Sequence, residues 1–351
     1  MSERPEISDL VLAIDGGNSK TDVMLVTRDG QVLSRVRGPG SPPQTVGMQR
    51  GLDTFERLIT EAARQAGYSG EAPFAAHTSA YLAGADLPKE EQFLQEAITA
   101  RGWSATTMVA NDTFALLRAG SPTGAGVAVV CGAGINAVGV APDGRVHRFP
   151  ALGRISGDWG GGAHLGSEAL WLAVRAEDGR GLPTELLPAV LAHFAVGSML
   201  ELIERLHFGE LSEDVLHELC PLLFRVAAAG DAVAAEVVDR LAEEVSLLAT
   251  VSLQSLGLTG EPVDVVLGGG VLTGVGATVI DEVARRCKAV APLATVSVVE
   301  VIPVVGAALA GLDALGADRA AEIRLRESFL APATDESAPI ADGDAGEPAA
   351  V

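Results

Sequence analysis

The sequence is poor in aromatic residues, in cysteine and in clustered positive charge. Aromatic residues make up only 4% of the chain, so buried cores must consist mainly of alanine, valine and leucine. The cysteines, Cys131, Cys220 and Cys287, lie far apart and form no CxxC pair, which argues against a structural zinc site and fits a reducing compartment. The net charge of −21, without clustered lysine or arginine, argues against partners such as nucleic acid or an anionic membrane.

A signal peptide and an uninterrupted membrane span are also missing. Residues 1–9 are polar and lack the apolar core of a signal peptide, so we expect a cytoplasmic protein. The stretch most similar to a membrane span, residues 296–312, contains Glu300, Pro303 and Gly306. This composition favours a buried strand that runs into a helix.

The chain is long and apolar enough for two domains. Its 351 residues exceed what one core usually serves, and 48% of them are hydrophobic. Residues 184–256 have an almost continuous helical pattern of apolar positions. The last residues, 331–351, carry prolines, alanines and acids but no basic residue, so we expect a disordered tail.

One acidic, glycine-bearing stretch organises the chain. Residues 14–22, with the sequence Ile-Asp-Gly-Gly-Asn-Ser-Lys-Thr-Asp, separate two apolar runs. The two glycines allow the backbone to approach an anion, Ser19 and Thr21 offer hydroxyl donors, and Asp15 can hold a magnesium ion at a strand end. We interpret the stretch as a phosphate-binding hairpin tip, and an ordinary hairpin turn is the alternative.

The same order of elements occurs a second time. Residues 126–130 form an apolar run, the turn Gly-Ala-Gly-Ile-Asn follows at 132–136, and a second apolar run, an Asp-Gly turn and a third strand continue to residue 149. The first unit likewise has a strand, a glycine turn, a strand, an Asp-Gly turn and a third strand, which ends near residue 36. We interpret the match as a duplication.

A pair of polar residues and a run of glycines are candidates for a catalytic site and a nucleotide-binding site. The β-branched run 106–110 ends on Asn111 and Asp112 before a helix, where open α/β sheets place catalytic groups. Capping that helix is the alternative role of Asp112. The strand at 263–267 delivers three consecutive glycines to a helix, a joint that suits a nucleotide.

Two loops are candidates for lining a cleft. Residues 38–44 contain three prolines and two glycines, which predicts an irregular loop. Residues 155–166 are dense in glycine around Trp159, so their backbone must pass close to another group or must move. A buried core position is the alternative for Trp159.

These motifs, in this order, resemble the actin, hexokinase and heat-shock-protein ATPase superfamily. The branch in question is the BadF/BadG/BcrA/BcrD type, which holds N-acetylglucosamine kinases of eukaryotic type and activator ATPases of coenzyme-A reductases. The resemblance implies two ribonuclease-H-like (actin-like ATPase) α/β domains around a central nucleotide cleft. They would be residues 1–119, completed by a C-terminal helix at about 304–325, and residues 120–303 with a helical insertion.

The resemblance also implies ATP and Mg²⁺ as cofactors, with Asp15 at the metal. The ATP-binding residues would be Gly16, Gly17, Asn18, Ser19, Lys20, Gly132, Ala133, Gly134, Asn136, Ala229, Gly230, Gly269 and Gly270. The residues that bind the acceptor would be Gln44, Asn111, Asp112, Asp158, Trp159, Gly160 and His164. Asp112 would be the general base that takes the proton of the attacking hydroxyl.

The resemblance implies a sugar kinase. The positions at which this sequence departs from the family pattern bear mainly on which acceptor is phosphorylated. Ser41 to Gln44 and His164 replace residues that touch the sugar in the relatives, and Ala133 and Ile135 replace usual hydroxyl positions. N-acetylglucosamine, phosphorylated at its 6-hydroxyl, is the first choice, and glucosamine, another amino sugar or a polyol stay open. The alternatives are an activator-type ATPase acting on a partner and a nucleotide-sensing regulator. A homodimer is the general expectation for the assembly.

Overall fold

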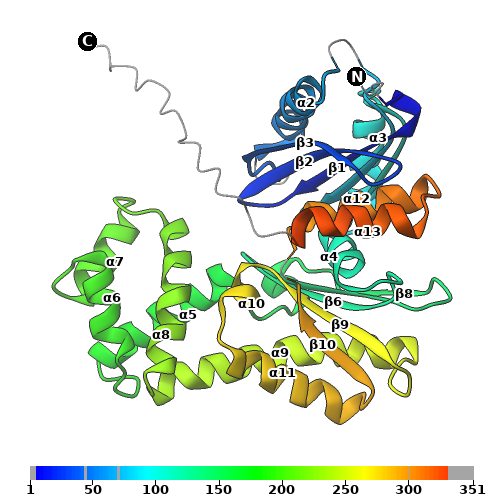
Figure 1. The fold of residues 1–351 in the computed structure, drawn as a ribbon. Coiled ribbons are helices and arrows are strands. Elements are labelled where there is room, and N and C mark those ends of the chain that lie inside the picture. Colours follow the sequence, from blue (N-terminus) through cyan, green and yellow to red (C-terminus); the bar gives the residue numbers. More distant parts are fainter. Residues whose placement is uncertain (1–4, 43–45, 69–71, 300, 331–351) are drawn as a thin grey trace, which may run out of the picture.

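The computed structural model describes residues 5–42, 46–68, 72–299 and 301–330 (Figure 1). The expected disordered tail at 331–351 and the candidate residue Gln44 lie outside these ranges. A short 3-10 helix, η1 (Ile7–Asp9), precedes the first strand. The described chain forms two mixed five-stranded sheets with helices around them, so the α/β prediction is confirmed.

The first sheet has the strand order β3-β2-β1-β4-β5. Its strands are β1 (Leu10–Gly16), β2 (Lys20–Thr27), β3 (Val32–Pro39), β4 (Ala75–Leu82) and β5 (Ser104–Asn111). The pairs β1–β2 and β2–β3 are antiparallel, whereas β1–β4 and β4–β5 are parallel. Two amphipathic helices, α2 (Met48–Gln65) and α3 (Pro88–Thr99), connect these strands and contribute side chains to the core on one face of the sheet.

The second sheet repeats this plan with the order β10-β9-β6-β7-β8. Its strands are β6 (Gly126–Cys131), β7 (Ile135–Val140), β8 (Val146–Arg148), β9 (Val263–Gly268) and β10 (Ala294–Val298). Again the pairs β6–β7 and β7–β8 are antiparallel, whereas β6–β9 and β9–β10 are parallel. The repeat of three-strand units that the sequence indicates is therefore present in the topology.

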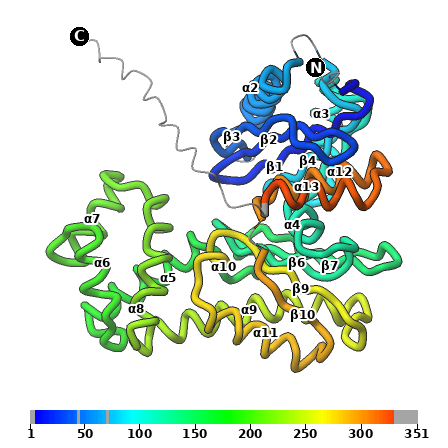
Figure 2. The backbone as a smooth tube through the Cα atoms, in the orientation of Figure 1, coloured from blue at the N-terminus to red at the C-terminus, as the bar shows by residue number. Residues whose placement is uncertain are grey.

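Helices α12 (Pro303–Ala314) and α4 (Asp112–Gly120) lie between the sheets (Figures 1 and 2). Helix α12 packs Val304 and Leu309 in one cluster with Val11 of β1. Helix α4 packs Leu116 and Leu117 in another cluster with Val266 of β9. The helix expected at about 304–325 is divided in the structure: α12 packs on the first sheet, and α13 (Arg319–Leu330) follows it.

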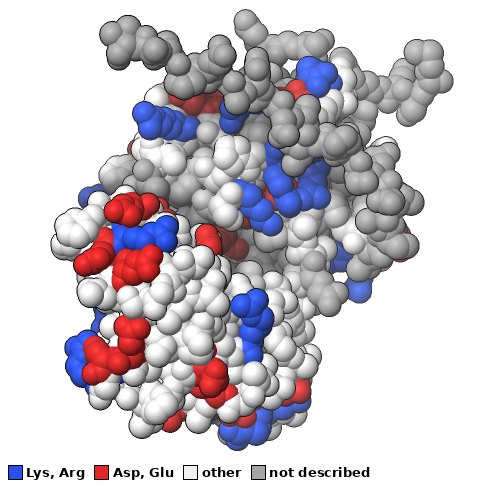
Figure 3. All heavy atoms as spheres, turned by 90° about the vertical axis from the view of Figure 1, so that its left-hand side faces the viewer, with Lys and Arg blue, Asp and Glu red and all other residues white. Residues whose placement is uncertain are grey.

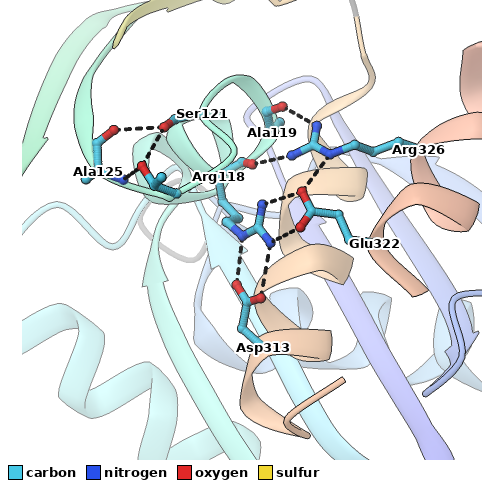
Figure 4. A network of polar contacts seen from close by, with 8 residues as sticks. Arg118, Ala119, Ser121, Ala125, Asp313, Glu322 and Arg326 are labelled. Atoms are coloured by element: carbon cyan, nitrogen blue, oxygen red, sulfur yellow. Dashed lines mark hydrogen bonds and ion pairs between the residues drawn. The ribbon is translucent and has the colours of Figure 1, made fainter. Parts of the chain in front are cut away.

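An ion-pair network fixes α12 and α13 to the end of α4 (Figure 4). Arg118, whose side chain is 11% exposed, binds Asp313 at 2.7 Å and Glu322 at 3.0 Å. Arg326 donates to the carbonyl oxygens of Ala119 at 2.6 Å and Arg118 at 3.1 Å. The last carbonyl groups of α4 are therefore paired by a residue about two hundred positions later in the chain.

The helical region expected within 184–256 is part of a longer helical insertion between β8 and β9 (Figure 1). The insertion comprises η2 (Gly153–Ser156), α5 (Gly162–Glu177), α6 (Leu186–Phe194), α7 (Met199–His207), η3 (Glu213–Glu218), α8 (Leu219–Ala228) and α9 (Ala232–Leu256). Helices α10 (Gly270–Gly274) and α11 (Ala277–Val290) then join β9 to β10.

The molecular surface is shown from one side in Figure 3. The lower half of this face consists mostly of uncharged residues, with separate groups of acidic and basic side chains between them.

Membrane-spanning potential is low in the described part of the chain. No single helix there is long and apolar enough to cross a membrane. Only α6 and α7 together, which are bent by 53° relative to each other, have the length and the apolar composition of a membrane span. Leu186 and Val190 of α6 and Met199 and Leu202 of α7 are instead buried in the core of the helical insertion. The stretch at 296–312 forms the end of β10 and most of α12.

Several boundaries differ from the expectation. Strand β3 continues to Pro39, which was expected in the irregular loop, because β3 is an edge strand and tolerates a missing N–H. Helix α5 begins at Gly162, so His164 lies in its first turn rather than in a loop. Strand β10 ends at Val298, although the sequence predicts a strand up to Val301. The single helix expected at about 304–325 is interrupted between Ala314 and Arg319.

Candidate active site

A cavity of about 260 Å³ brings the two glycine turns together. The first turn contributes Asp15, Gly17, Asn18, Ser19 and Lys20, and the second contributes Gly132, Ala133, Gly134, Ile135 and Asn136. The other lining residues are Ala83, Asp86, Asp112, Leu116, Val130, Ala151, Gly269 and Pro303. The repeat in the sequence thus places two similar turns around one space.

Both turns are closed by a backbone hydrogen bond at the tip. The amide of Gly17 donates to the carbonyl of Lys20 at 2.9 Å, and the amide of Gly132 donates to the carbonyl of Gly134 at 2.9 Å. Gly269 follows β9 with a φ of +89°, and a Cβ atom there would lie 2.5 Å from the carbonyl oxygen of Cys131. Only glycine fits that conformation without displacing the backbone.

Asp15 is a buried carboxylate on the face of β1 that looks toward α12. Burial raises the pKa of Asp15 to about 7, helped by Asp112 and Asp22 and opposed by Lys20 and Arg37. Its neighbour across the hairpin, Asp22, is fully buried and is bound by Arg35 and Arg37, each at 3.0 Å. The negative charge of Asp22 is therefore compensated by two arginines of the protein, whereas Asp15 lines the cavity.

The helix that follows β5 has its cap supplied by Asn111. The Oδ1 atom of Asn111 accepts from the amide of Thr113 at 3.0 Å and from its hydroxyl at 2.6 Å. Asp112 is therefore not the capping residue, and its side chain lines the cavity. Burial raises the pKa of Asp112 to about 6, against the effect of the backbone amides of Thr113 and Asp112.

A polar network joins the two sheets beside Asp112. The amide nitrogen of Asn111 donates to Oδ1 of Asp86 at 2.9 Å, and that of Asn136 reaches the same oxygen at 3.4 Å. The amide nitrogen of Asn136 also lies 3.2 Å from Oδ1 of Asn111. On the outer side, Arg148 of β8 binds Glu91 of α3 at 2.8 Å.

Asp86, Glu91 and Arg148 were not among the candidates drawn from the sequence. A signal for Asp86 was available, because β4 and β5 are adjacent parallel strands whose carboxyl ends meet at one edge. The sequence predicts a strand over residues 74–79 only, which places Asp86 too far from that edge. The strand in fact continues to Leu82, which pairs with Asn111.

The donors of the cavity fit a magnesium ion bound together with phosphates. In the described part of the chain no cluster of three or more His, Cys, Asp or Glu side chains could hold a metal ion by itself. Mg²⁺ commonly takes one or two carboxylates, with substrate phosphates and water as its other ligands. Asp15, which lines the cavity, matches that kind of site.

The tryptophan loop lies behind the second turn and does not line the cavity. The amide of Gly162 donates to the carbonyl of Gly132 at 2.7 Å. Trp159 is 9% exposed in the core, with Arg240 4.3 Å above its ring and the ring of His164 at 5.1 Å. Neither these side chains nor Gly160 reaches the cavity lining, so the sugar contacts of Trp159, Gly160 and His164 stay predictions.

The carboxylate of Asp158 forms hydrogen bonds within the same loop. Its Oδ2 accepts from the amide of Gly153 and from the hydroxyl of Ser156, both at 2.8 Å. The carboxylate therefore closes the short helix η2, and it is absent from the cavity lining. A contact between Asp158 and the acceptor likewise stays a prediction.

The predicted nucleoside-binding residues Ala229 and Gly230 are adjacent in the chain to residues that line a second cavity. Ala229 and Gly230 form the turn between α8 and α9, where Asp231 caps α9 by accepting from the amide of Ala234 at 2.8 Å. They line neither cavity, but Ala227 and Ala228 line a space of about 770 Å³ between α8, α9 and α11. Gly16 and Gly270 adjoin residues that line the first cavity.

Comparisons with known proteins agree with this arrangement. The BadF/BadG/BcrA/BcrD ATPase family matches residues 12–311. An N-acetylmuramic acid/N-acetylglucosamine kinase of Clostridium acetobutylicum is 27% identical over 76% of this chain and 86% of its own length. An N-acetyl-D-glucosamine kinase of Dictyostelium discoideum is 25% identical over 72% of this chain and 82% of its own length.

A solved structure shares the fold. It is that of a candidate N-acetylglucosamine kinase from Chromobacterium violaceum, with a TM-score of 0.68 and 24% identity. The match covers 88% of this chain and all of the other. Since the family match extends over most of the sequence, with both glycine turns inside it, the chain belongs to the BadF/BadG/BcrA/BcrD ATPase family.

Proposed function

We propose that the protein is an ATP-dependent kinase that phosphorylates a hydroxyl of an amino sugar. The observation that carries the proposal is the position of Asp112, a carboxylate in a cavity between two glycine turns. The names of the two relatives support a sugar acceptor of this class. N-acetylglucosamine, with the 6-phosphate as product, is the acceptor we propose first.

We further propose that the two sheets belong to two domains with the nucleotide between them. The backbone amides of the two turns would bind the phosphate oxygens, since glycine-rich turns present N–H groups to anions. The nucleoside would extend past Gly269 toward the cavity between α8, α9 and α11, which opens beside Ala228. Mg²⁺ at Asp15 would neutralise charge on the phosphates.

Asp112 would act as the general base of the transfer. Phosphoryl transfer depends mostly on positioning and on neutralising charge, so the base is needed only as the acceptor oxygen loses its proton. Because burial raises the pKa of Asp112 to about 6, its carboxylate is a stronger base than an exposed aspartate and is still ionised at neutral pH. Lys20, which also lines the cavity, would stay close to the phosphates.

The activator-type alternative is less well supported. The resemblance to the activator ATPases would imply cysteines that bind an iron–sulfur cluster between two subunits, whereas Cys131, Cys220 and Cys287 are all buried. Burial raises the pKa of all three thiols, to about 12 for Cys131 and about 11 for the other two. Reactive or ligating cysteines need an ionised thiol, which this environment disfavours.

A panel of acceptors tests the proposal. ADP release is followed with ATP and Mg²⁺ in the presence of N-acetylglucosamine, N-acetylmuramic acid, glucosamine, glucose or no sugar. We expect an amino sugar to raise the rate well above the rate with water alone, and we expect Asp112→Asn to remove the increase. If no sugar in the panel raises ADP release by the purified protein, the kinase proposal is wrong.

A further inference from the structure

Asp86 has one carboxylate oxygen bound and the other unbound. Its Oδ1 accepts from the side-chain amides of Asn111 and Asn136, at 2.9 and 3.4 Å. Its Oδ2 has no hydrogen-bond partner among the described residues, although the side chain lines the cavity together with Asp112. The two amides thus fix the carboxylate and leave an acceptor atom available to a ligand.

The backbone that carries Asp86 is fixed by both sheets. The carboxylate of Glu90 accepts from the amides of Asp86 and Leu87, at 3.1 and 2.9 Å. The guanidinium of Arg148, from the second sheet, donates to the carbonyls of Ala85 and Asp86 at 3.2 and 3.1 Å. A side chain supported in this way is preorganised, so it loses little entropy when it binds a ligand.

The charge of Asp86 is poorly compensated within the protein. No lysine or arginine of the described chain forms an ion pair with its carboxylate, since Arg148 is directed to the backbone and to Glu91. Burial, Asp112 and Glu90 raise the pKa of Asp86 to about 7, opposed by Arg148 and Asn111. A structural link between the sheets would need only an amide at this position, whereas the carboxyl group of Asp86 offers a second oxygen, Oδ2, that can bind a donor from outside.

Other side chains that the sequence suggests as acceptor-binding groups contact residues of the protein itself. Asp158 closes η2, and the ring of Trp159 is covered by Arg240. Asn111 uses its Oδ1 on Thr113 and its amide on Asp86. Asp86 therefore supplies, beside Asp112, an unbound carboxylate oxygen in the cavity.

We propose that Asp86 binds the acceptor, with its Oδ2 accepting a hydrogen bond from an O–H or N–H group that is not the one phosphorylated. This inference rests on the proposed kinase function and adds to it the group that orients the acceptor. Asp112 takes the proton of the attacking hydroxyl, and Asp86 fixes a second polar group of the same molecule. The two carboxylates thus select an acceptor with at least two donors.

The test compares Asp86→Asn with the wild-type enzyme in the acceptor panel. The asparagine keeps an oxygen for Asn111 and Asn136 but replaces the unbound acceptor atom by a donor. We expect KM for the acceptor to rise by roughly 10-fold to 100-fold, the range for a lost hydrogen bond to a charged group. We expect KM for ATP to change less than threefold, because the phosphates are bound by the glycine turns.

Analogues of the acceptor identify the bonded group. Each analogue lacks one hydroxyl or the acetamido N–H, and KM is measured for both proteins. The analogue without the partner of Asp86 should raise KM strongly in the wild type and hardly at all in Asp86→Asn. Asp53→Asn, an exposed aspartate of α2, is the matched control and should behave as wild type.

The outcomes separate the two proposals. If the wild type releases no ADP in response to any sugar, the kinase function fails and the role of Asp86 fails with it. If the wild type is active and Asp86→Asn keeps its acceptor KM, only the role of Asp86 is wrong. An equal rise in both KM values would also overturn it, since it would indicate a purely structural link. A melting curve checks folding, and Asp86→Ser replaces the asparagine variant if that variant is unfolded.

Discussion

The side-chain nitrogen of Asn136 lies 3.2 Å from Oδ1 of Asn111, and this contact joins the second glycine turn to the helix cap after β5. The two residues come from different sheets. Their contact sits directly beside the cavity, with Asp86 as the shared acceptor of both amides. The relative position of the two turns therefore depends on side chains that border the ligand space.

Removal of this contact should open the space between the sheets. Asn136→Ala deletes the two hydrogen bonds that the Asn136 side chain donates to Asp86 and Asn111, and we expect the radius of gyration to increase in the absence of nucleotide. ATP with Mg²⁺ should restore a compact state, because phosphates bound to both turns bring them together. Small-angle X-ray scattering measures the change, and equal radii for variant and wild type without nucleotide would contradict the expectation.

The activity should depend on the ionisation of Asp112. Its pKa is raised to about 6 by burial, and a protonated carboxyl cannot accept the proton of the acceptor. We therefore expect kcat/KM to fall as the pH decreases from about 7 to below about 6, because Asp15 and Asp86, whose pKa values are raised to about 7, are also protonated over the same range. In Asp112→Asn the rate should be lower by a factor of about 100 or more, and the part of the acidic limb near a pH of about 6 should be missing. An unaltered limb in the variant would assign it to another group.

Asp15 should reduce stability at alkaline pH. The folded-state pKa of Asp15 is about 7, well above the value of about 4 in an unfolded chain. Between these values the unfolded state binds fewer protons, so stability falls as the pH rises from about 4 to 7. Asp15→Asn should thus raise Tm at pH 8, by about 2 °C or more, but not at pH 4, and should abolish activity. A lower Tm at pH 8 would refute this account.

The ion pairs of Arg118 should contribute to stability above acid pH. Arg118→Met removes the partner of Asp313 and Glu322 (Figure 4), at a cost of about 1–3 kcal/mol. Hydrogen bonds from Arg118 lower the pKa of Glu322, so this contribution is lost as the pH falls below about 4. Urea unfolding measures the difference. Arg64→Met, at an exposed pair within α2, is the control and should reduce the free energy of unfolding much less than Arg118→Met does.

Local patterns in the sequence were sufficient for most of the sheet elements and for both glycine turns. The turn at Gly17 and the turn at Gly132 were predictable because each combines flexible residues with flanking apolar strands. Their approach to one cavity was inferred only from the repeat and from the family resemblance. The helical insertion was predictable as well, since its apolar positions have a helical period.

The cross-sheet network was not predictable from the sequence. Asp86 is 25 positions from Asn111 and 50 from Asn136, and no local pattern links residues at such distances. The orientation of Trp159 was undecided for a similar reason, because a tryptophan in a glycine-rich loop suits both a core and a ligand site. Arg240, which covers its ring, comes from α9, far along the chain.

The most direct test of the central claim follows the γ-phosphoryl group of ATP. Wild-type enzyme and Asp112→Asn are incubated with ATP, Mg²⁺ and N-acetylglucosamine, and the products are resolved by phosphorus NMR. We predict a sugar phosphate ester as the main product of the wild type and almost none from the variant. Inorganic phosphate as the only product, formed equally with and without any sugar of the panel, would contradict the account.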